Sequence, residues 1–326
     1  MQFHSMVADG IMKIEIPVEG ANPILAYRMG GQEQGARIVI TAGVHGCEYV
    51  GVQTVRALMK RLKTEHLKGE VILVPMVNEE GFYEGAKQMV PSDGKNLNRC
   101  FPGNIQGTVT ERMAAALEQA LYPDTTFLID LHGGDVNERL TPLVFCPVDG
   151  EKSVVETAKE AARALTVPYR VASRAKNGLY SWAVQCGIPA LLLERGCQGV
   201  WREAEVEYTV RDIYRILEHF HVIDAGASRG TEKQQVEIQC AEYIEAETQG
   251  FWNPTVTERM DIRQGDILGI MTDIYGNVIR EYRAQFDGVV MYYTLSLGVK
   301  AGTPLVAVGK GEICAEKYIL DRSEEM

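Results

Sequence analysis

Short apolar runs and amphipathic stretches take turns along the chain up to about residue 220. Apolar and polar residues alternate from Met12 to Val18, which predicts a half-buried strand. The later apolar runs are short enough for strands that are covered on both faces, and they span residues 37–42, 70–77, 126–131, 141–146 and 190–193.

The stretches between these runs have apolar residues at helical spacing. They predict helices over residues 49–62, 110–121, 152–164, 180–186 and 203–220. Strands that alternate with helices in this way predict an α/β fold, in which a mostly parallel or mixed sheet is flanked by helices.

The pattern changes after His221. Residues 226–235 are small and polar, which predicts a linker, and the chain beyond it is rich in Gly, Val, Ile and Tyr without helical periodicity. Residues 262–268 and 299–305 match in their apolar and glycine positions, which suggests duplicated hairpins in a two-fold sandwich. We therefore divide the chain into an α/β domain over residues 1–226 and a C-terminal β-sandwich or barrel-sandwich-like domain over residues 227–326.

Charge and composition restrict the partners. The 33 Lys and Arg residues are outnumbered by 44 Asp and Glu, and the net charge of −11 repels nucleic acid. No stretch approaches the roughly 18 apolar residues of a membrane helix, and the first residues lack the pattern of a secretory leader. The 7 cysteines are scattered without a Cys-x-x-Cys pair, which argues against a disulfide framework. We expect a cytoplasmic protein without nucleic-acid or membrane partners, and we leave homo-oligomers open.

A first candidate site lies in Ala-Gly-Val-His-Gly-Cys-Glu, residues 42–48, between a predicted strand and a predicted helix. Ligands of α/β folds usually bind at this end of a strand. If the turn opens into a helix, His45 and Glu48 can converge on one metal ion. The alternative is a solvated loop in which Glu48 interacts with the helix dipole.

A second histidine closes the predicted strand in Leu-Ile-Asp-Leu-His-Gly-Gly, residues 128–134. His132 would complete the two-histidine, one-carboxylate set of a catalytic zinc site, with the fourth position left for water. Asp130 would lie on the same strand face and orient the imidazole. The alternative is a core histidine with its hydrogen bonds satisfied.

Two more polar residues, Glu194 and Arg99, are candidates for a functional site. Glu194 ends the apolar run 190–193, where partial burial would raise its pKa toward that of a general base, unless it simply pairs with Arg195. Arg99 lies in a loop rich in turn residues, and its guanidinium suits bidentate capture of a carboxylate, although a loop arginine is usually only solvated.

Taken together, the motifs resemble the succinylglutamate desuccinylase/aspartoacylase family of the zinc carboxypeptidase superfamily. The resemblance rests on Gly-Val-His-Gly-x-Glu at 43–48, Asn-Leu-Asn-Arg-x-Phe-Pro-Gly at 96–103, Asp-Leu-His-Gly-Gly at 130–134 and Leu-Glu-Arg-Gly at 193–196. The motifs occur in the family's order and span most of the first domain, and the β-rich C-terminal part also looks like that of the family.

The resemblance implies roles for individual residues. His45, Glu48 and His132 would bind one Zn²⁺ per chain, and Glu194 would be the general base. Two further residues, Asn98 and Arg99, would hold the substrate carboxylate.

One position departs from the family pattern. Many members have an arginine before Pro-x-Asp-Gly that polarises the scissile carbonyl, and Gln88 stands there in this chain, beside Lys87. Neighbouring side chains on an extended loop tend to point apart, so we expect only one of the two to face the substrate, with Gln88 favoured. Arg174 and Arg195 are the next candidates for the donor.

The resemblance implies a zinc-dependent deacylase that cleaves the linear amide bond of an N-acyl amino acid or a similar small carboxylate. The alternatives are a zinc carboxypeptidase that acts on short peptides and, from another class, a non-catalytic metal- or ligand-binding protein.

Other signals are weaker. Gly-x-Ser-x-Gly at 226–230 lacks the flanking strand and the later histidine of a serine hydrolase. His219 and His221 would close a helix, where imidazoles commonly interact with the dipole. The C-terminal part looks like a lipoyl or biotin carrier, but Met-Tyr-Tyr at 291–293 stands where the modified lysine is expected.

Overall fold

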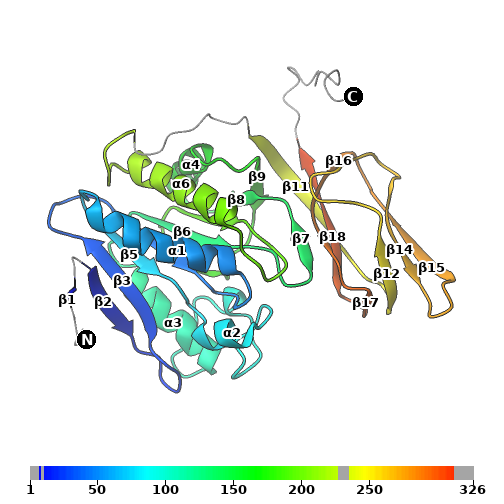
Figure 1. Cartoon of the computed structure of the whole chain (residues 1–326), viewed down its shortest axis with the longest axis horizontal. Coiled ribbons are helices and arrows are strands. Elements are labelled where there is room, and N and C mark those ends of the chain that lie inside the picture. The colour runs from blue at the N-terminus through cyan, green and yellow to red at the C-terminus, as the bar shows by residue number, and fades with distance from the viewer. Residues whose placement is uncertain (1–6, 9–10, 227–234, 312–326) are drawn as a thin grey trace.

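One mixed sheet runs through the computed structural model, which describes residues 7–8, 11–226 and 235–311 (Figure 1). Within these residues the sheet has 14 strands, in the order β1-β2-β3-β5-β4-β6-β10-β8-β9-β11-β18-β16-β13, with β7 also paired to β16. The strands of its helical part are β1 (Val7–Ala8), β2 (Ile11–Ile16), β3 (Ile24–Gly30), β4 (Arg37–Ala42), β5 (Glu70–Val74), β6 (Phe127–His132), β8 (Leu143–Pro147), β9 (Tyr169–Ser173) and β10 (Ala190–Glu194).

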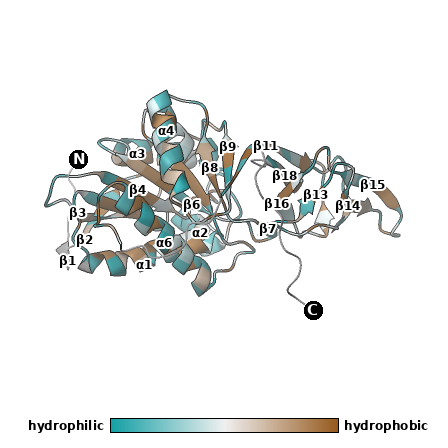
Figure 2. Cartoon of the chain, turned by 90° about the horizontal axis from the view of Figure 1, so that it is seen from above, coloured by the Kyte–Doolittle hydropathy of each residue, from teal (hydrophilic) through white to brown (hydrophobic). Residues whose placement is uncertain are grey.

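Helices cover both faces of this part of the sheet. They are α1 (Tyr49–Arg61), α2 (Glu79–Glu84), α3 (Val109–Leu121), α4 (Lys152–Arg163), α5 (Leu179–Gln185) and α6 (Glu203–His219), with short 3₁₀ turns η1 (Leu62–Thr64) and η2 (Leu97–Arg99). Figure 2 shows α1 and α3 on opposite sides of the strands. The predicted α/β class is confirmed, and none of the described helices is long and apolar enough to cross a membrane.

Two apolar cores explain this layering. In β4, the side chains of Ile38 and Ile40 join the core beneath α1 and α6, whereas Val39 joins the core beneath α3 and α5. Since successive strand residues point to opposite faces, a run with no polar position can bury both faces at once. The apolar runs of the sequence therefore lie in the middle of the sheet.

Helix bounds agree with the sequence pattern to within a residue or two, but some elements have no such pattern. In β9 only Val171 is fully buried, so no apolar run marks the strand. The helix α2 is six residues long, too short for a periodicity, and begins where the Asn78 side chain accepts a hydrogen bond from the Gly81 N–H at 2.9 Å. The strand predicted over 70–77 ends at Val74 because Pro75 follows, which has no N–H to donate.

The C-terminal part is built from β strands and extends away from the helices (Figures 1 and 2). Four strands of this part, together with the short strand β7 (Glu138–Leu140), continue the large sheet, and the others form a second sheet of order β15-β14-β12-β17. The strands are β11 (Val236–Glu245), β12 (Gly250–Pro254), β13 (Asp261–Ile262), β14 (Ile267–Thr272), β15 (Val278–Arg283), β16 (Gly288–Thr294), β17 (Gly298–Val299) and β18 (Pro304–Gly311).

The repeated segments 262–268 and 299–305 occupy equivalent places in these two sheets. Each consists of a short strand, a turn with a glycine at positive φ (Gly265 and Gly302) and the start of a long strand. They are not hairpins, because β13 pairs in the large sheet and β14 in the small one, whereas β17 pairs in the small sheet and β18 in the large one. The repeat therefore marks two crossings between sheets, in opposite directions.

The large sheet continues from the helical part into the C-terminal part. Strand β11 pairs in parallel with β9, and Ile238 lies opposite Val171 in the register. The boundary that we predict between residues 226 and 227 borders segment 227–234, which lies outside the described residues, as does most of the predicted linker. The division into two domains therefore stays a prediction.

A buried ion pair fixes helix α6 to the end of β10. Arg195 is 5 % exposed, and its Nη2 lies 2.7 Å from Oδ2 of Asp212, which is fully buried. Asp212 also accepts a hydrogen bond from the N–H of Thr166 at 2.6 Å.

We expect Asp212→Ala to lower the free energy of unfolding by about 3–5 kcal/mol, because it leaves a buried guanidinium without its charged partner. The matched control is Glu207→Ala on the same helix, since Glu207 pairs with Arg61 at the surface. An exposed pair is worth about 0–1 kcal/mol. Urea denaturation of both variants measures the difference, and equal losses would contradict the prediction.

Candidate metal centre and cleft

The predicted site residues come together at the carboxyl ends of three neighbouring strands. His45 lies in the loop that follows β4, His132 is the last residue of β6 and Glu194 is the last residue of β10. In the register between β10 and β6, Glu194 lies opposite His132. Parallel strands that end at one edge of a sheet therefore bring the three motifs to one place.

The loop after β4 approaches helix α2 closely. A Cβ atom on Gly46 would lie 2.0 Å from the carbonyl oxygen of Gly81, so this position requires glycine. Glu48 follows as the residue before the first turn of α1. The loop thus turns His45 and Glu48 toward the same point.

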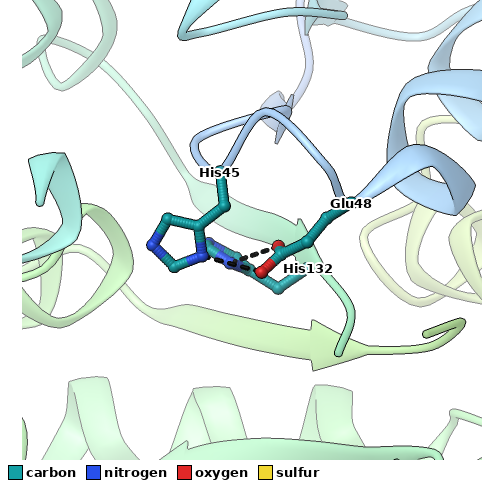
Figure 3. A group of neighbouring side chains, drawn as sticks. All are labelled: His45, Glu48 and His132. Atoms are coloured by element: carbon teal, nitrogen blue, oxygen red, sulfur yellow. Dashed lines mark hydrogen bonds and ion pairs between the residues drawn. The ribbon is translucent and has the colours of Figure 1, made fainter. Parts of the chain in front are cut away.

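His45, Glu48 and His132 form a compact cluster (Figure 3). One carboxylate oxygen of Glu48 lies 2.7 Å from Nδ1 of His45, and the other lies 2.9 Å from Nδ1 of His132. All three residues are buried, and one nitrogen or oxygen atom from each lies within 4.8 Å of the others. Two nitrogens and one oxygen at this separation are a donor set that suits zinc.

The charges of the cluster favour a cation. Burial opposes ionisation of Glu48, but attraction to His45 and His132 outweighs it and lowers the pKa of the carboxyl to about 2. Burial also opposes a charge on His132, yet the carboxylates of Asp130 and Glu48 raise its pKa well above the usual value. The surroundings therefore stabilise positive charge at this point.

Asp130 orients the imidazole of His132, as its position two residues earlier in the strand predicts. Its Oδ2 lies 2.9 Å from Nε2 of His132, and its Oδ1 accepts a hydrogen bond from the hydroxyl of Thr41 at 2.7 Å. This contact leaves Nδ1 of His132 on the side of Glu48. A carboxylate behind a ligand histidine is a common arrangement in metal sites.

Glu194 lines the cleft beside this cluster. Its Oε2 atom is buried and has no hydrogen-bond partner among the described residues. Burial raises the pKa of its carboxyl well above the usual value, and the nearby charge of Glu48 raises it further. The alternative pairing with Arg195 does not occur, because that guanidinium binds Asp212 and Thr209.

Asn98 and Arg99 line the same cleft. Oδ1 of Asn98 accepts a hydrogen bond from the N–H of Leu179 at 3.0 Å, and a Cβ on Gly178 would lie 2.4 Å from that oxygen. The side-chain amide nitrogen of Asn98 is then available as a donor. Arg99 is exposed, donates through Nη1 to the carbonyl of Asn98 at 2.7 Å and pairs with no acidic side chain of the described residues.

Gln88 lines the cleft, whereas Lys87 does not. Our expectation that the two side chains point apart is wrong. Gln88 has a φ of 52°, so the chain turns there, and both side chains reach the buried carboxylate of Asp135. Nε2 of Gln88 lies 2.6 Å from Asp135, and Nζ of Lys87 lies 3.3 Å from it and 2.7 Å from Oδ1 of Asn137.

The other candidate donors lie elsewhere. Arg174 is exposed and pairs with Asp149 at 3.2 Å, and neither it nor Arg195 lines the cleft. His219 makes an edge-to-face contact with Phe220 and belongs to no metal-binding group among the described residues. Ser228 lies outside the described residues.

The cleft has a volume of about 390 Å³ and draws residues from both parts of the chain. Tyr243 of β11 and Tyr292 of β16 lie on its C-terminal wall, with ring centroids 6.4 Å apart. A separate cavity of about 230 Å³ beside β3 contains none of the predicted site residues. A cleft of the size of the first suits a small ligand.

Sequence patterns missed five residues of this region. Oδ1 of Asn96 lies 3.2 Å from Nε2 of His45, Asp135 accepts a hydrogen bond from Gln88, and Glu138 lines the cleft. Tyr243 and Tyr292 reach the cleft from strands far along the chain. The asparagine could have been found in its motif, whereas the tyrosines carry no local signal.

Comparison with known proteins agrees with the motifs. Residues 34–220 match the profile of the succinylglutamate desuccinylase/aspartoacylase catalytic domain. The chain is 28 % identical over 296 residues to N-alpha-acetyl-L-2,4-diaminobutyric acid deacetylase of Halomonas elongata. The matched region covers 88 % of this chain and 85 % of that protein.

Solved structures share the fold over nearly the whole chain. The product-bound ectoine utilization protein EutE of Ruegeria pomeroyi superimposes with a TM-score of 0.82 at 23 % identity, covering 94 % of this chain and 98 % of that one. A succinylglutamate desuccinylase of Silicibacter sp. TM1040 superimposes with a TM-score of 0.83 at 23 % identity. The superposition covers 96 % of this chain and 100 % of that one. With a profile match over more than half of its length, this chain belongs to the succinylglutamate desuccinylase/aspartoacylase family.

Proposed function

We propose that the protein is a zinc-dependent hydrolase that deacylates an N-acyl amino acid or a similar small carboxylate, with one Zn²⁺ per chain. The proposal is carried by the donor atoms of His45, Glu48 and His132, which lie within 4.8 Å of one another. Beside them lies Oε2 of Glu194, which has no hydrogen-bond partner among the described residues. Relatives bearing deacetylase and desuccinylase names support the same class of reaction.

The donor set fits zinc. The three side chains are buried in the protein and also line the cleft, so a bound ion would keep one side open to substrate and water. Zinc held there would supply a Lewis acid for the scissile carbonyl and for the attacking water.

The other side chains would do the remaining chemistry. Glu194 would take a proton from the attacking water and pass it to the leaving amine, which its raised pKa suits. Arg99 would bind the carboxylate of the amino-acid part, with Asn98 donating its amide to the same group. Gln88 would hydrogen-bond the carbonyl oxygen with the amide hydrogen that Asp135 leaves free.

The size of the cleft favours a small substrate. Tyr243 and Tyr292 wall it on the C-terminal side, which disfavours a long peptide. A screen of N-acyl amino acids and short peptides, with amine release as the readout, tests the choice. Release from peptides alone would select the carboxypeptidase, and zinc binding without any release would select the non-catalytic binding protein.

The first prediction concerns the metal. We expect His45→Ala and His132→Ala each to lose both zinc and activity, because three ligands leave no redundancy. Metal content after dialysis, measured by atomic absorption, is the readout. His66→Ala is the control, since His66 is exposed and pairs with Glu33. Full zinc occupancy in the first two variants would remove them from the ligand set.

The second prediction concerns the base. Glu194→Gln should keep the fold and the zinc while lowering kcat about 10²-fold or more, because the amide cannot accept the proton. Steady-state kinetics, with metal content and circular dichroism as controls, tests this. Turnover near that of the wild type would place the base on another residue.

The third prediction separates the carboxylate contact from general damage. Arg99→Ala should reduce kcat/KM about 10²-fold for a substrate with a free carboxylate and much less for the corresponding amide, since a charge-assisted hydrogen bond is lost only with the acid. Both substrates are assayed with the same variant. Equal losses would exclude Arg99 from carboxylate recognition.

The fourth prediction concerns the carbonyl donor. Loss of one preorganised hydrogen-bond donor typically lowers the rate about 10²-fold. We expect kcat to fall by nearly this factor in Gln88→Ala and by a smaller factor in Lys87→Ala. Neither change should alter zinc content. The kinetics of the two variants are compared directly, and a larger loss for Lys87→Ala would assign the donor to the lysine.

A further inference from the structure

The floor of the cleft is apolar. Beyond Glu194, the face of the large sheet that the cleft exposes presents aliphatic and aromatic side chains from several successive strands. These side chains are Leu192 of β10, Leu143 and Phe145 of β8, Val171 of β9, Ala241 of β11, Met291 of β16 and Ala307 of β18. We call this set the apolar floor.

Strand register connects the apolar floor directly to the catalytic end of the cleft. Leu143 is the partner of Glu194 in the pairing of β8 with β10, and Leu192 is the partner of Phe145. Phe145 is in turn the partner of Val171 in β9. A group attached next to the scissile bond therefore meets apolar side chains within one strand spacing of Glu194.

Two hydroxyl groups near the apolar floor, those of Tyr180 and Ser181, already have hydrogen-bond partners. The hydroxyl of Tyr180 bonds to Oγ of Ser173, and Oγ of Ser181 bonds to the N–H of Gly178 at 2.9 Å. Both residues line the cleft, and their hydroxyls offer a polar ligand less than unbonded hydroxyls would.

Positive charge in the cleft is confined to one arginine. Arg99 is the only Lys or Arg among the described residues that line it. Lys87 contacts the lining residue Glu138 at 3.5 Å, but its ammonium is held by Asp135 and Asn137. A second carboxylate on the substrate would thus meet no further Lys or Arg among the described residues of the lining, and Glu138 and Glu194 would repel it when ionised.

We propose that the substrate carries a single carboxylate and an apolar substituent that lies on the apolar floor. This inference rests on the proposed function and narrows it to N-acyl derivatives of amino acids such as leucine, methionine or phenylalanine. Transfer of an apolar side chain onto such a surface is favourable, whereas a carboxylate placed there loses its hydration without a partner.

A substrate panel tests the proposal with the zinc-loaded enzyme. N-acetyl-L-leucine, N-acetyl-L-asparagine and N-acetyl-L-aspartate have side chains of comparable size that are apolar, polar and charged. We expect kcat/KM for the leucine derivative to exceed that for the aspartate derivative about 10²-fold or more. N-hexanoylglycine carries the apolar group on the acyl side, and a higher kcat/KM for this compound than for N-acetyl-L-leucine would contradict the placement of the amino-acid side chain on the floor.

A charge placed on the apolar floor should change this preference. Ala241→Arg adds a cation at a partly exposed floor position, and we expect the leucine-to-aspartate ratio of kcat/KM to fall about 10-fold or more. The control is Cys240→Arg, because Cys240 is the exposed neighbour that does not line the cleft. An unchanged ratio in the first variant, or an equal change in both, would overturn the role of the floor.

Binding separates this inference from the proposed function. Calorimetric titration of zinc-loaded Glu194→Gln with the same compounds measures preference without turnover. Tighter binding of the leucine derivative than of the aspartate derivative supports the apolar floor. If the wild type nevertheless releases no amine from any compound, the deacylase activity is rejected and the apolar floor is kept. Hydrolysis with preference for aspartate, succinylglutamate or N-acetyldiaminobutyrate would keep the deacylase and reject the apolar floor. Absence of both binding and turnover would reject both.

Discussion

A single buried carboxylate organises the candidate centre. Glu48 contacts two imidazoles, one with each oxygen, and one of these oxygens also accepts the N–H of Gly133 at 3.2 Å. Because the carboxylate is buried, its negative charge is stable only while all of these partners are in place. The loop after β4 and the end of β6 must therefore keep a fixed relative position, and the parallel pairing of β4 with β6 supplies it.

The remaining features of the cleft depend on the same sheet. Glu194 is positioned by the pairing of β10 with β6, and the apolar floor by the pairings that continue through β8, β9 and β11. One side of the site is thus a series of strand ends that carry polar groups, and the other is a sheet face that carries apolar ones. The same register that fixes the proposed chemistry also fixes the surroundings of the substrate.

Local patterns in the sequence were sufficient for much of this arrangement. The strand before His132 is an apolar run interrupted only by Asp130, so both the strand and the place of the histidine at its carboxyl end could be predicted. Glu194 follows the same rule. Contacts across the sequence were not accessible, because nothing near Gln88 indicates that Asp135 lies beside it.

The C-terminal strands illustrate the same limit. The repeat of glycines and apolar positions predicted a two-fold arrangement, but the pairing partners depend on packing between the sheets, and the predicted hairpins are crossings instead. Tyr243 reaches the cleft because a bulge between Ile238 and Cys240 interrupts the register of β11. An irregularity of this kind has no signature in residue spacing.

The continuity of the large sheet from β9 into β11 also bears on cooperativity. Two globules joined only by a flexible tether can melt one after the other, each with its own transition. Here the pairing of residues 169–171 of β9 with residues 236–238 of β11, together with the pairing of β7 and β16, binds the two parts laterally. Separation of the parts would expose the strand edges on both sides. Loss of the β-rich part would therefore also loosen β8 and β9, and with them the part of the apolar floor that these strands carry.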